Sequence, residues 1–187
     1  MNVLLVDNYD SFTFNLYHLL ESMVDRVTVI RNDELDFNTV KSFDKIILSP
    51  GPGLPSESEK LIPLIQEFYT KKSILGICLG HQAIAEVFDC NLLNMSDVKH
   101  GKKSCLDFID DREVLFDSIE ENTVVGHYHS WVIDPNTISN ELKVTSKSDD
   151  LIMSISHESY DVKGLQFHPE SILTTQGDVI LRSWINS

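Results

Sequence analysis

The sequence predicts an α/β protein with an open, mostly parallel central sheet, flanking helices and an added section of antiparallel strands. In the first half, short runs of Val, Leu and Ile alternate with longer stretches whose apolar residues recur at helical spacing. In the second half, short strand-like runs follow one another directly. Strands that alternate with helices favour parallel pairing with right-handed crossovers, whereas consecutive strands favour hairpins at the edge of such a sheet.

The first half contains the predicted parallel strands and the helices between them. The strands are expected at Asn2–Val6, Arg26–Ile30, Lys45–Leu48 and Ser73–Ile77. A first helix, with Ser11 as its N-cap, is predicted from the helical spacing of Phe12, Leu16, Leu19, Leu20 and Met23. Two further helices are expected over Ser58–Tyr69 and Gly80–Phe88.

The second half is predicted to add antiparallel strands. These are expected at Leu106–Ile109, Thr123–Tyr128, Leu142–Ser146, Leu151–Ser156 and Val162–Phe167. Asp149 and Asp150 predict a turn between two of them, and an amphipathic helix over residues 179–185 follows. Because no internal repeat or linker interrupts the sequence, residues 1–187 are expected to form a single domain.

The composition argues against several classes of protein. The 187 residues include 15 Lys and Arg against 29 Asp and Glu, so the formal net charge is −14. A nucleic-acid partner is not expected, because the chain lacks the cationic clusters that bind a phosphate backbone. No apolar run approaches the ~18 residues of a membrane span. Cys78, Cys90 and Cys105 do not form a disulfide framework, so we expect a cytoplasmic protein in which Cys90 and Cys105 are small core residues.

The most informative motif is Gly76-Ile77-Cys78-Leu79-Gly80, a Gly-x-Cys-x-Gly pattern between a predicted strand and a predicted helix. It is a nucleophile-elbow pattern with Cys in place of Ser. The sharp turn needs very small residues two positions before and two positions after the nucleophile. The N-terminus of the following helix presents N–H groups to the sulfur and favours its anionic form. The alternative is a buried Cys in a tight turn.

A nucleophilic cysteine needs a base, and the base needs a group that orients it. His168 follows the last predicted strand, and Pro169 fixes the chain between His168 and Glu170. His168 would take the proton from Cys78, and Glu170 would hold the imidazole in the required tautomer. A histidine at a strand end is more often a surface or core residue, so this assignment depends on the elbow.

The third motif is the loop Ser49-Pro50-Gly51-Pro52-Gly53, which follows a predicted buried strand. Interleaved glycines and prolines make a stiff loop with exposed backbone amides, which suits an oxyanion. By itself the loop is only a turn. However, Ser49 and Cys78 both follow the carboxyl ends of parallel strands, and that is the edge at which α/β sheets place their sites.

Taken together, these three motifs resemble the triad class, class I, of glutamine amidotransferases. The resemblance covers nearly the whole chain, including Asp7–Thr13, His100–Lys102, Tyr128–Trp131 and Gln166–Thr174. These segments look like the small subunits of anthranilate synthase and aminodeoxychorismate synthase. Those subunits hydrolyse glutamine and pass the ammonia to a chorismate-binding synthase subunit, for the tryptophan or the folate route.

The resemblance implies roles for individual residues of this chain. Cys78 would attack the glutamine carboxamide, with His168 as base and then acid and Glu170 as its orienting group. The backbone amides of Gly51 and Leu79 would form the oxyanion hole. The glutamine contacts would come from Gly51, Gly53, Gln82, Ser130 and Trp131. No metal or other cofactor is expected in this chain, because its histidines and cysteines lack ligand spacing, although the partner synthase can need Mg²⁺.

The resemblance also implies an interface with the synthase subunit. The loop Asn8-Tyr9-Asp10-Ser11 and the loop His100-Gly101-Lys102 would face it, although the first could equally be a plain turn or helix cap. Lys99, His127 and Trp131 stand where the family more often has Met, Arg and Leu. Trp131 would act through its backbone, so this difference leaves the chemistry intact.

Two other functions stay open at this point. The chain could be a free-standing Cys-His-Glu hydrolase of γ-glutamyl amides, which would use water and need no partner. It could also be a non-catalytic regulatory module that keeps the fold. Within the main hypothesis, no residue selects between anthranilate and 4-amino-4-deoxychorismate synthesis.

Overall fold

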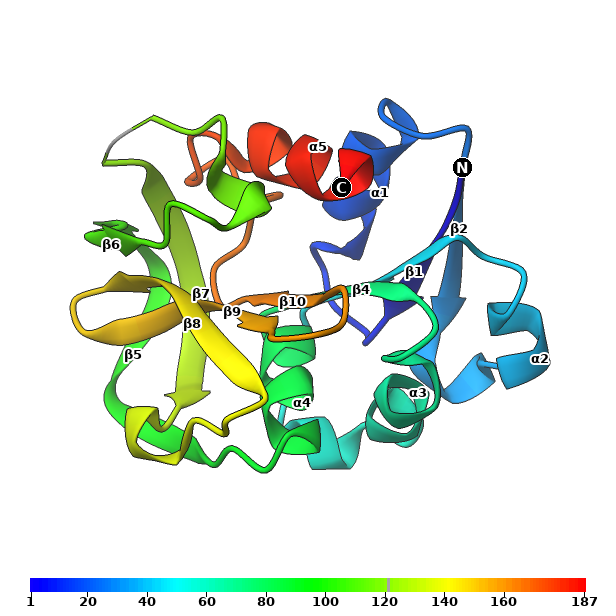
Figure 1. Ribbon diagram of the computed structural model, residues 1–187, viewed down its shortest axis with the longest axis horizontal. Helices are drawn as coiled ribbons and strands as arrows, with labels where there is room; N and C mark the ends of the chain where they lie inside the picture. Colours follow the sequence, from blue (N-terminus) through cyan, green and yellow to red (C-terminus); the bar gives the residue numbers. More distant parts are fainter. Residues whose placement is uncertain (121) are drawn as a thin grey trace.

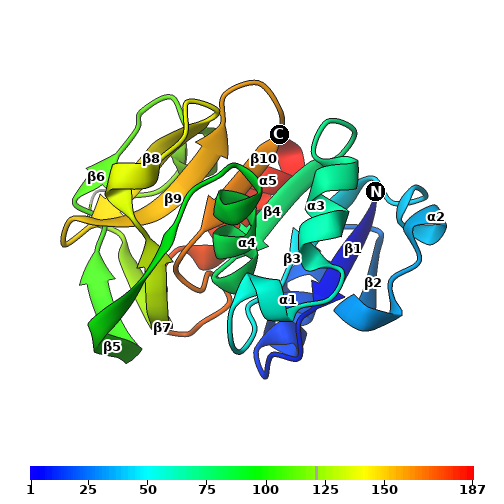
Figure 2. The same ribbon diagram turned by 90° about the horizontal axis from the view of Figure 1, so that it is seen from below.

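The computed structural model describes residues 1–120 and 122–187. Within these residues, an eight-stranded sheet has the order β2-β1-β3-β4-β10-β9-β8-β6, which Figure 2 shows from below. The first five strands in this order are parallel: β2 (Arg26–Arg31), β1 (Asn2–Asp7), β3 (Lys45–Leu48), β4 (Ser73–Ile77) and β10 (Val162–Leu165). The four predicted parallel strands are therefore confirmed. The prediction for Val162–Phe167 was wrong, because β10 was expected among the antiparallel strands and instead pairs parallel with β4 inside the sheet.

The sheet continues with antiparallel strands beyond β10. They are β9 (Leu151–His157), β8 (Leu142–Ser148) and the short β6 (Phe108–Ile109). The predicted turn between β8 and β9 is present, and Asp149 and Asp150 both have left-handed backbones, with φ of 50° and 64°. Two successive positive φ values are typical of the tight hairpin turn that matches the twist of the strands.

A second sheet pairs β5 (Leu92–Cys105) with β7 (Val124–Ile133) in antiparallel fashion, at the left of Figure 1. The strand β5 was not predicted from the sequence, and His100–Lys102 was expected to be a loop. The strand has little apolar alternation because most of its side chains are exposed. It is held by its pairing with β7, and the pairing register shifts between His100 and Lys102, where Gly101 has a φ of 65°.

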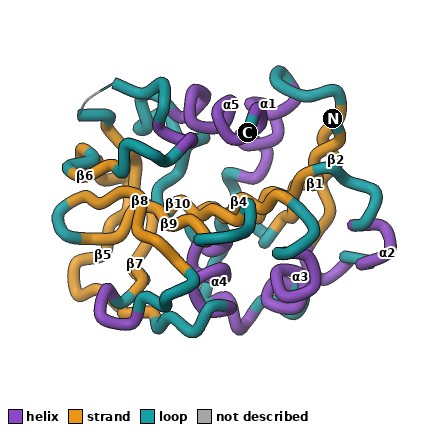
Figure 3. Tube along the Cα trace, in the orientation of Figure 1, coloured by secondary structure: helices purple, strands orange, loops and turns teal. Residues whose placement is uncertain are grey.

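Helices cover both faces of the large sheet (Figures 1 and 3). One face holds α1 (Thr13–Glu21) and α5 (Gly177–Asn186), and the other holds α2 (Phe37–Val40), α3 (Leu61–Phe68) and α4 (Leu79–Val87). The side chains of β1 alternate between these layers, with Val3 and Leu5 on the first and Leu4 and Val6 on the second. Short 3₁₀ helices lie at Asn32–Glu34, Pro55–Glu57, Val114–Phe116 and Pro135–Thr137.

The start of α1 differs from the prediction. The helix begins at Thr13, and Ser11 is exposed and does not cap it. The carboxylate of Asp7 instead fastens the preceding loop, because its Oδ1 accepts from the Tyr9 N–H at 2.9 Å and from Thr13 Oγ1 at 2.8 Å. A carboxylate accepts several hydrogen bonds at once, so Asp7 fixes the loop that leads into α1, although no side chain caps the helix itself.

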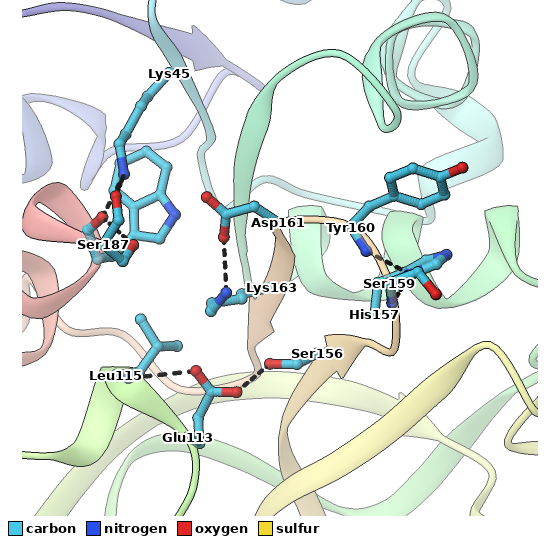
Figure 4. Close-up of polar contacts among 11 residues, drawn as sticks. Lys45, Glu113, Leu115, Ser156, His157, Ser159, Tyr160, Asp161, Lys163 and Ser187 are labelled. Atoms are coloured by element: carbon cyan, nitrogen blue, oxygen red, sulfur yellow. Dashed lines mark hydrogen bonds and ion pairs between the residues drawn. The ribbon is translucent and has the colours of Figure 1, made fainter.

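Polar contacts, some of them buried, hold the edge of the sheet at which the parallel strands begin (Figure 4). Lys45 Nζ donates to the Trp184 carbonyl oxygen at 2.6 Å and to a Ser187 main-chain oxygen at 3.0 Å. Nearby, Lys163 pairs with Asp161 at 2.7 Å, and Ser156 donates to the buried Glu113 carboxylate at 2.5 Å. The Lys45 contacts fix the end of α5 to the sheet.

No helix of the described residues has the length and apolar character to cross a membrane.

Candidate active site

Cys78 lies in a sharp turn between β4 and α4. It occupies the N-cap position of α4 with φ 50° and ψ −97°, a strained backbone for a residue other than glycine. A Cβ atom on Gly76 would lie 2.4 Å from the backbone of Gly80, and one on Gly80 would lie 2.7 Å from Leu48. The two glycines are therefore required by close packing, and the structure has the turn that the Gly-x-Cys-x-Gly motif predicts.

His168 and Glu170 lie beside this turn and are both buried. His168 Nδ1 is 2.7 Å from Glu170 Oε1, so the carboxylate holds the proton on Nδ1 and leaves Nε2 for Cys78. Burial lowers the pKa of His168, but the neighbouring Cys78 and Glu170 outweigh this and raise the pKa to about 10. The structure thus brings the three predicted catalytic side chains together.

Two aromatic rings enclose the imidazole of His168. Its ring centroid is 5.6 Å from that of Phe12 and 5.0 Å from that of Tyr128. The Tyr128 ring in turn contacts His100 of β5, with a centroid distance of 5.4 Å. Neither Phe12 nor the Tyr128 ring was predicted to belong to the site, because aromatic residues at these positions also fit an ordinary core.

A pocket of about 190 Å³ opens above Cys78. This is smaller than the ~300 Å³ at which pockets for drug-sized ligands begin, so it suits a small metabolite. The residues that line it include Cys78 and all five predicted glutamine-contacting residues; together they are Gly51, Pro52, Gly53, Cys78, Gln82, Tyr128, His129, Ser130 and Trp131. Segments far apart in the sequence therefore form one small site.

The Gly/Pro loop that follows β3 forms one side of this pocket. Ser49 anchors it, since Ser49 Oγ accepts from the Asn8 N–H at 2.9 Å and the Asn8 side chain donates to the Ser49 carbonyl at 2.8 Å. A Cβ atom on Gly51 would lie 2.6 Å from the Leu79 side chain. Gly51 and Leu79, the two predicted oxyanion-hole residues, are therefore neighbours, and Leu79 begins α4, where N–H groups lack helical partners.

The side-chain amides of Gln82 and Gln166 link the pocket wall to Cys78. Gln82 Nε2 donates to the Trp131 carbonyl at 2.9 Å and to Gln166 Oε1 at 3.3 Å. Gln166 Nε2 lies 3.7 Å from Cys78 Sγ, and Gln166 is fully buried. No site role was predicted for Gln166. The sequence feature that could have indicated such a role is strand alternation, because residues two apart, such as Gln166 and His168, point to the same side of a strand.

The predicted interface segments are only partly at the surface. Asn8 does not fit the prediction, because its side chain is buried and bonded to Ser49 and Asn32. Tyr9, with 51% of its surface exposed, and Ser11 lie at the protein surface, as predicted. His100, Gly101 and Lys102 are exposed on β5, and Asp10 is half-buried.

One exposed apolar residue near the site was not foreseen. Ile172, two residues after Glu170, is 96% exposed. It borders a groove of about 470 Å³ that also includes Phe12, Leu19 and Pro169. An isoleucine so fully exposed beside a candidate catalytic group marks this face as a candidate contact surface.

Other histidines and cysteines lie near the site, and one of them, His129, lines the pocket. Burial lowers the pKa of His81 to about 3 and that of His129 to about 3, so both are neutral. His129 Nε2 lies 3.1 Å from His127 Nδ1, in the neighbouring inward-facing position of β7. Cys90 is buried as predicted, whereas the prediction for Cys105 was wrong, because Cys105 is exposed on the edge of β5.

Known proteins resemble this chain along its whole length. Residues 4–186 match the family model described as glutamine amidotransferase class-I. Aminodeoxychorismate synthase component 2 of Klebsiella aerogenes is 42% identical over 187 residues, which covers 98% of this chain and 99% of the relative. Aminodeoxychorismate/anthranilate synthase component 2 of Bacillus subtilis (strain 168) is 36% identical over 188 residues, with 99% and 96% covered.

Solved structures share the fold. A Thermoplasma acidophilum protein assigned as a GMP synthase component superposes with a TM-score of 0.88, over 100% of this chain and 92% of that chain. The sequence identity is 24%, so this likeness concerns the arrangement of the elements alone.

Proposed function

Because this chain belongs to the class I glutamine amidotransferase family, we propose that it is the glutamine-hydrolysing subunit of a chorismate-using synthase. It delivers ammonia for anthranilate or for 4-amino-4-deoxychorismate. The relatives from K. aerogenes and B. subtilis support this proposal, since their names include one or both of these synthases and they match the chain over nearly its full length. The chain itself needs no metal or cofactor, and it acts in the cytoplasm.

The proposed reaction proceeds through a covalent thioester on Cys78. His168 Nε2 holds the proton taken from the Cys78 thiol, in agreement with the raised pKa of His168, and Sγ attacks the carboxamide carbon of glutamine. The backbone N–H groups of Gly51 and Leu79 stabilise the oxyanion, each such donor contributing roughly 3 kcal/mol. Ammonia leaves with the proton from His168, and water then cleaves the thioester to glutamate and the free thiol. The balance is glutamine plus water to glutamate plus ammonia.

The remaining pocket residues bind the amino-acid end of glutamine. Gly53 and the backbones of Ser130 and Trp131 supply main-chain polar groups, and Gln82 holds the Trp131 carbonyl at 2.9 Å. The observation that carries this proposal is the pocket itself, in which these residues surround Cys78. A cavity of about 190 Å³ accommodates one amino acid beside the sulfur.

The synthase subunit is proposed to cover the face around this pocket. Of the residues proposed to meet it, Tyr9, Ser11, His100, Gly101 and Lys102 are exposed and Asp10 is half-buried. His100 lies next to the pocket, since its ring is 5.4 Å from that of Tyr128, which lines it. Ile172 extends this face with a fully exposed apolar side chain. Burying an isoleucine side chain in an interface contributes about 1.5–3 kcal/mol, which makes Ile172 a strong candidate anchor.

Replacement of the nucleophile tests the proposed function. In a complex with the synthase subunit, Cys78→Ser should abolish product formation from glutamine and leave product formation from ammonia intact, because the synthase site is unchanged. Cys90→Ser, at a buried cysteine away from the pocket, is the matched control and should keep both activities. Product formation from glutamine at the normal rate with Cys78→Ser would refute the nucleophile assignment.

The partner is identified by adding anthranilate-type and aminodeoxychorismate-type synthase subunits separately and measuring glutamate release. Stimulation by one names the pathway, and stimulation by both indicates a shared subunit. Glutamate release that neither partner changes, with faster cleavage of γ-glutamyl peptides, would instead identify a free-standing hydrolase.

A further inference from the structure

The orientations of the two buried amides near Cys78 are fixed by their partners. The Trp131 carbonyl can only accept a hydrogen bond, so Gln82 must present its NH₂ group there, at 2.9 Å. The same NH₂ group donates to Gln166 Oε1 at 3.3 Å. Gln166 must therefore turn its own NH₂ group the other way, and that group lies 3.7 Å from Cys78 Sγ.

The backbone around Gln166 is held firmly opposite Cys78. Leu165 of β10 pairs with Ile77 of β4, so Gln166 and Cys78 follow at adjacent strand ends. The Cys78 N–H donates to the Leu165 carbonyl at 2.7 Å, and the Gln166 N–H donates to the Met153 carbonyl of β9 at 2.8 Å. The side-chain amide is thus presented to the sulfur by two fixed strands.

The chemistry of the contact depends on the charge of the sulfur. Gln166 is fully buried, and Cys78 Sγ is the one acceptor that its NH₂ group meets among the described residues. A neutral thiol is a weak acceptor, whereas a thiolate is a strong one, and hydrogen bonds to charged groups are about twice as strong as neutral ones. The amide therefore stabilises the anion more than the thiol.

We propose that Gln166 is a further catalytic residue of glutamine hydrolysis, which donates a hydrogen bond to the Cys78 sulfur and stabilises its anionic form. Gln82 is the positioning residue that orients the Gln166 amide, and through the Trp131 carbonyl it joins this orientation to the wall of the substrate pocket. This inference rests on the proposed function of Cys78 as the nucleophile.

Alkylation of Cys78 by iodoacetamide tests the inference without glutamine or a synthase. The background carries Cys90→Ser and Cys105→Ser, so that Cys78 is the single thiol. Gln166→Met keeps the length of the side chain and removes the donor, and it should slow alkylation at neutral pH by roughly 10- to 100-fold, the effect of losing one hydrogen bond to a charged group. The full rate should return only at more alkaline pH.

The matched control is Gln66→Met, at an exposed glutamine of α3, which should leave the alkylation rate unchanged. A purely structural Gln166 would lower the thermal stability of the variant and leave the rate and pH profile of the folded protein as they are. That result would overturn the inference.

Two further measurements keep the test decisive. If Gln166→Met does not fold, Gln82→Met must slow alkylation, because the Gln166 amide then loses the donor that orients it; an unchanged rate in Gln82→Met would overturn the inference. In the synthase complex, Gln166→Met should lower kcat far more than it raises KM. Alkylation that depends on Gln166 in a chain that releases no glutamate would refute the proposed function and leave the Gln166–Cys78 interaction established.

Discussion

Gly76 and Gly80 make the Cys78 turn possible because neither position has room for a Cβ atom. The clash at Gly76 would be with the backbone of Gly80 and His81, which cannot rotate away as a side chain can. At Gly101 the constraint is conformational, since its φ of 65° strains any other residue, whereas no described residue other than its chain neighbours comes within 4 Å of its Cβ position. Alanine at Gly76 therefore tests the effect of a steric clash, and alanine at Gly101 tests the effect of backbone conformation alone.

Gly76→Ala should lower the free energy of unfolding by about 1–3 kcal/mol, because the turn has no room for the added methyl group. It should also abolish glutamine hydrolysis, because the overpacked turn displaces Cys78. Gly101→Ala should cost about 1 kcal/mol through backbone conformation alone and leave hydrolysis by the isolated chain nearly unchanged. Urea unfolding and glutamate release measure both effects. Equal effects of the two variants on hydrolysis would contradict the assignment.

At the scale of elements, the loop after β1 supports the loop after β3. Asn8 is buried and bonds to Ser49 at two points, whereas its neighbour Tyr9 is half exposed. The same short loop therefore has an inner residue that holds the oxyanion segment and an outer residue whose ring is half exposed, although its hydroxyl donates to Asp33 at 2.7 Å.

Asn8→Ala should lower kcat for glutamine about tenfold, because the Ser49 carbonyl loses its donor and the Gly51 backbone is no longer fixed. Its affinity for the synthase should change little. Tyr9→Ala should show the reverse, a weaker complex with nearly normal hydrolysis at saturating synthase. Titration calorimetry and steady-state kinetics separate the two, and a loss of affinity confined to Asn8→Ala would contradict this division of the loop.

Across the whole molecule, buried histidines couple stability to pH. Burial lowers the pKa of His81 and His129 to about 3, and burial, together with the charge of Lys99, lowers that of His127 to about 4. Below the ordinary histidine pKa of 6.5, the unfolded chain binds protons that the folded chain does not, so stability falls as the pH falls. His168 has the opposite sign, because its raised pKa gives stability that is lost as the pH rises from 6.5 towards 10.

The free energy of unfolding should therefore be largest near pH 6.5–7. Between pH 6.5 and 5 it should fall by at most about 1.4 kcal/mol per pH unit for each of the three neutral histidines. His127→Gln should make this slope shallower. Urea unfolding at several pH values measures it, and a free energy that stays constant or rises from pH 6.5 to pH 5 would contradict the neutral state of these side chains.

The parallel core and the site motifs could be predicted from the sequence because both depend on local patterns. Continuous apolar runs marked β1, β3 and β4, and the glycines around Cys78 marked the turn. The strand β5 could not be predicted, because its exposed polar side chains carry no alternation and its conformation comes from pairing with β7. The buried position of Asn8 and the contact of Gln166 with Cys78 also arise only when distant strands meet.

The formation of a glutamyl thioester on Cys78 is the central claim about this molecule. The most direct measurement is acid quenching of the synthase complex during turnover with ¹⁴C-labelled glutamine, followed by peptide mass mapping. We expect a glutamyl group on the peptide that contains Cys78, its absence in Cys78→Ser and its presence in Cys90→Ser. Continued turnover with no labelled intermediate at Cys78, or with the label on another residue, would contradict this mechanism.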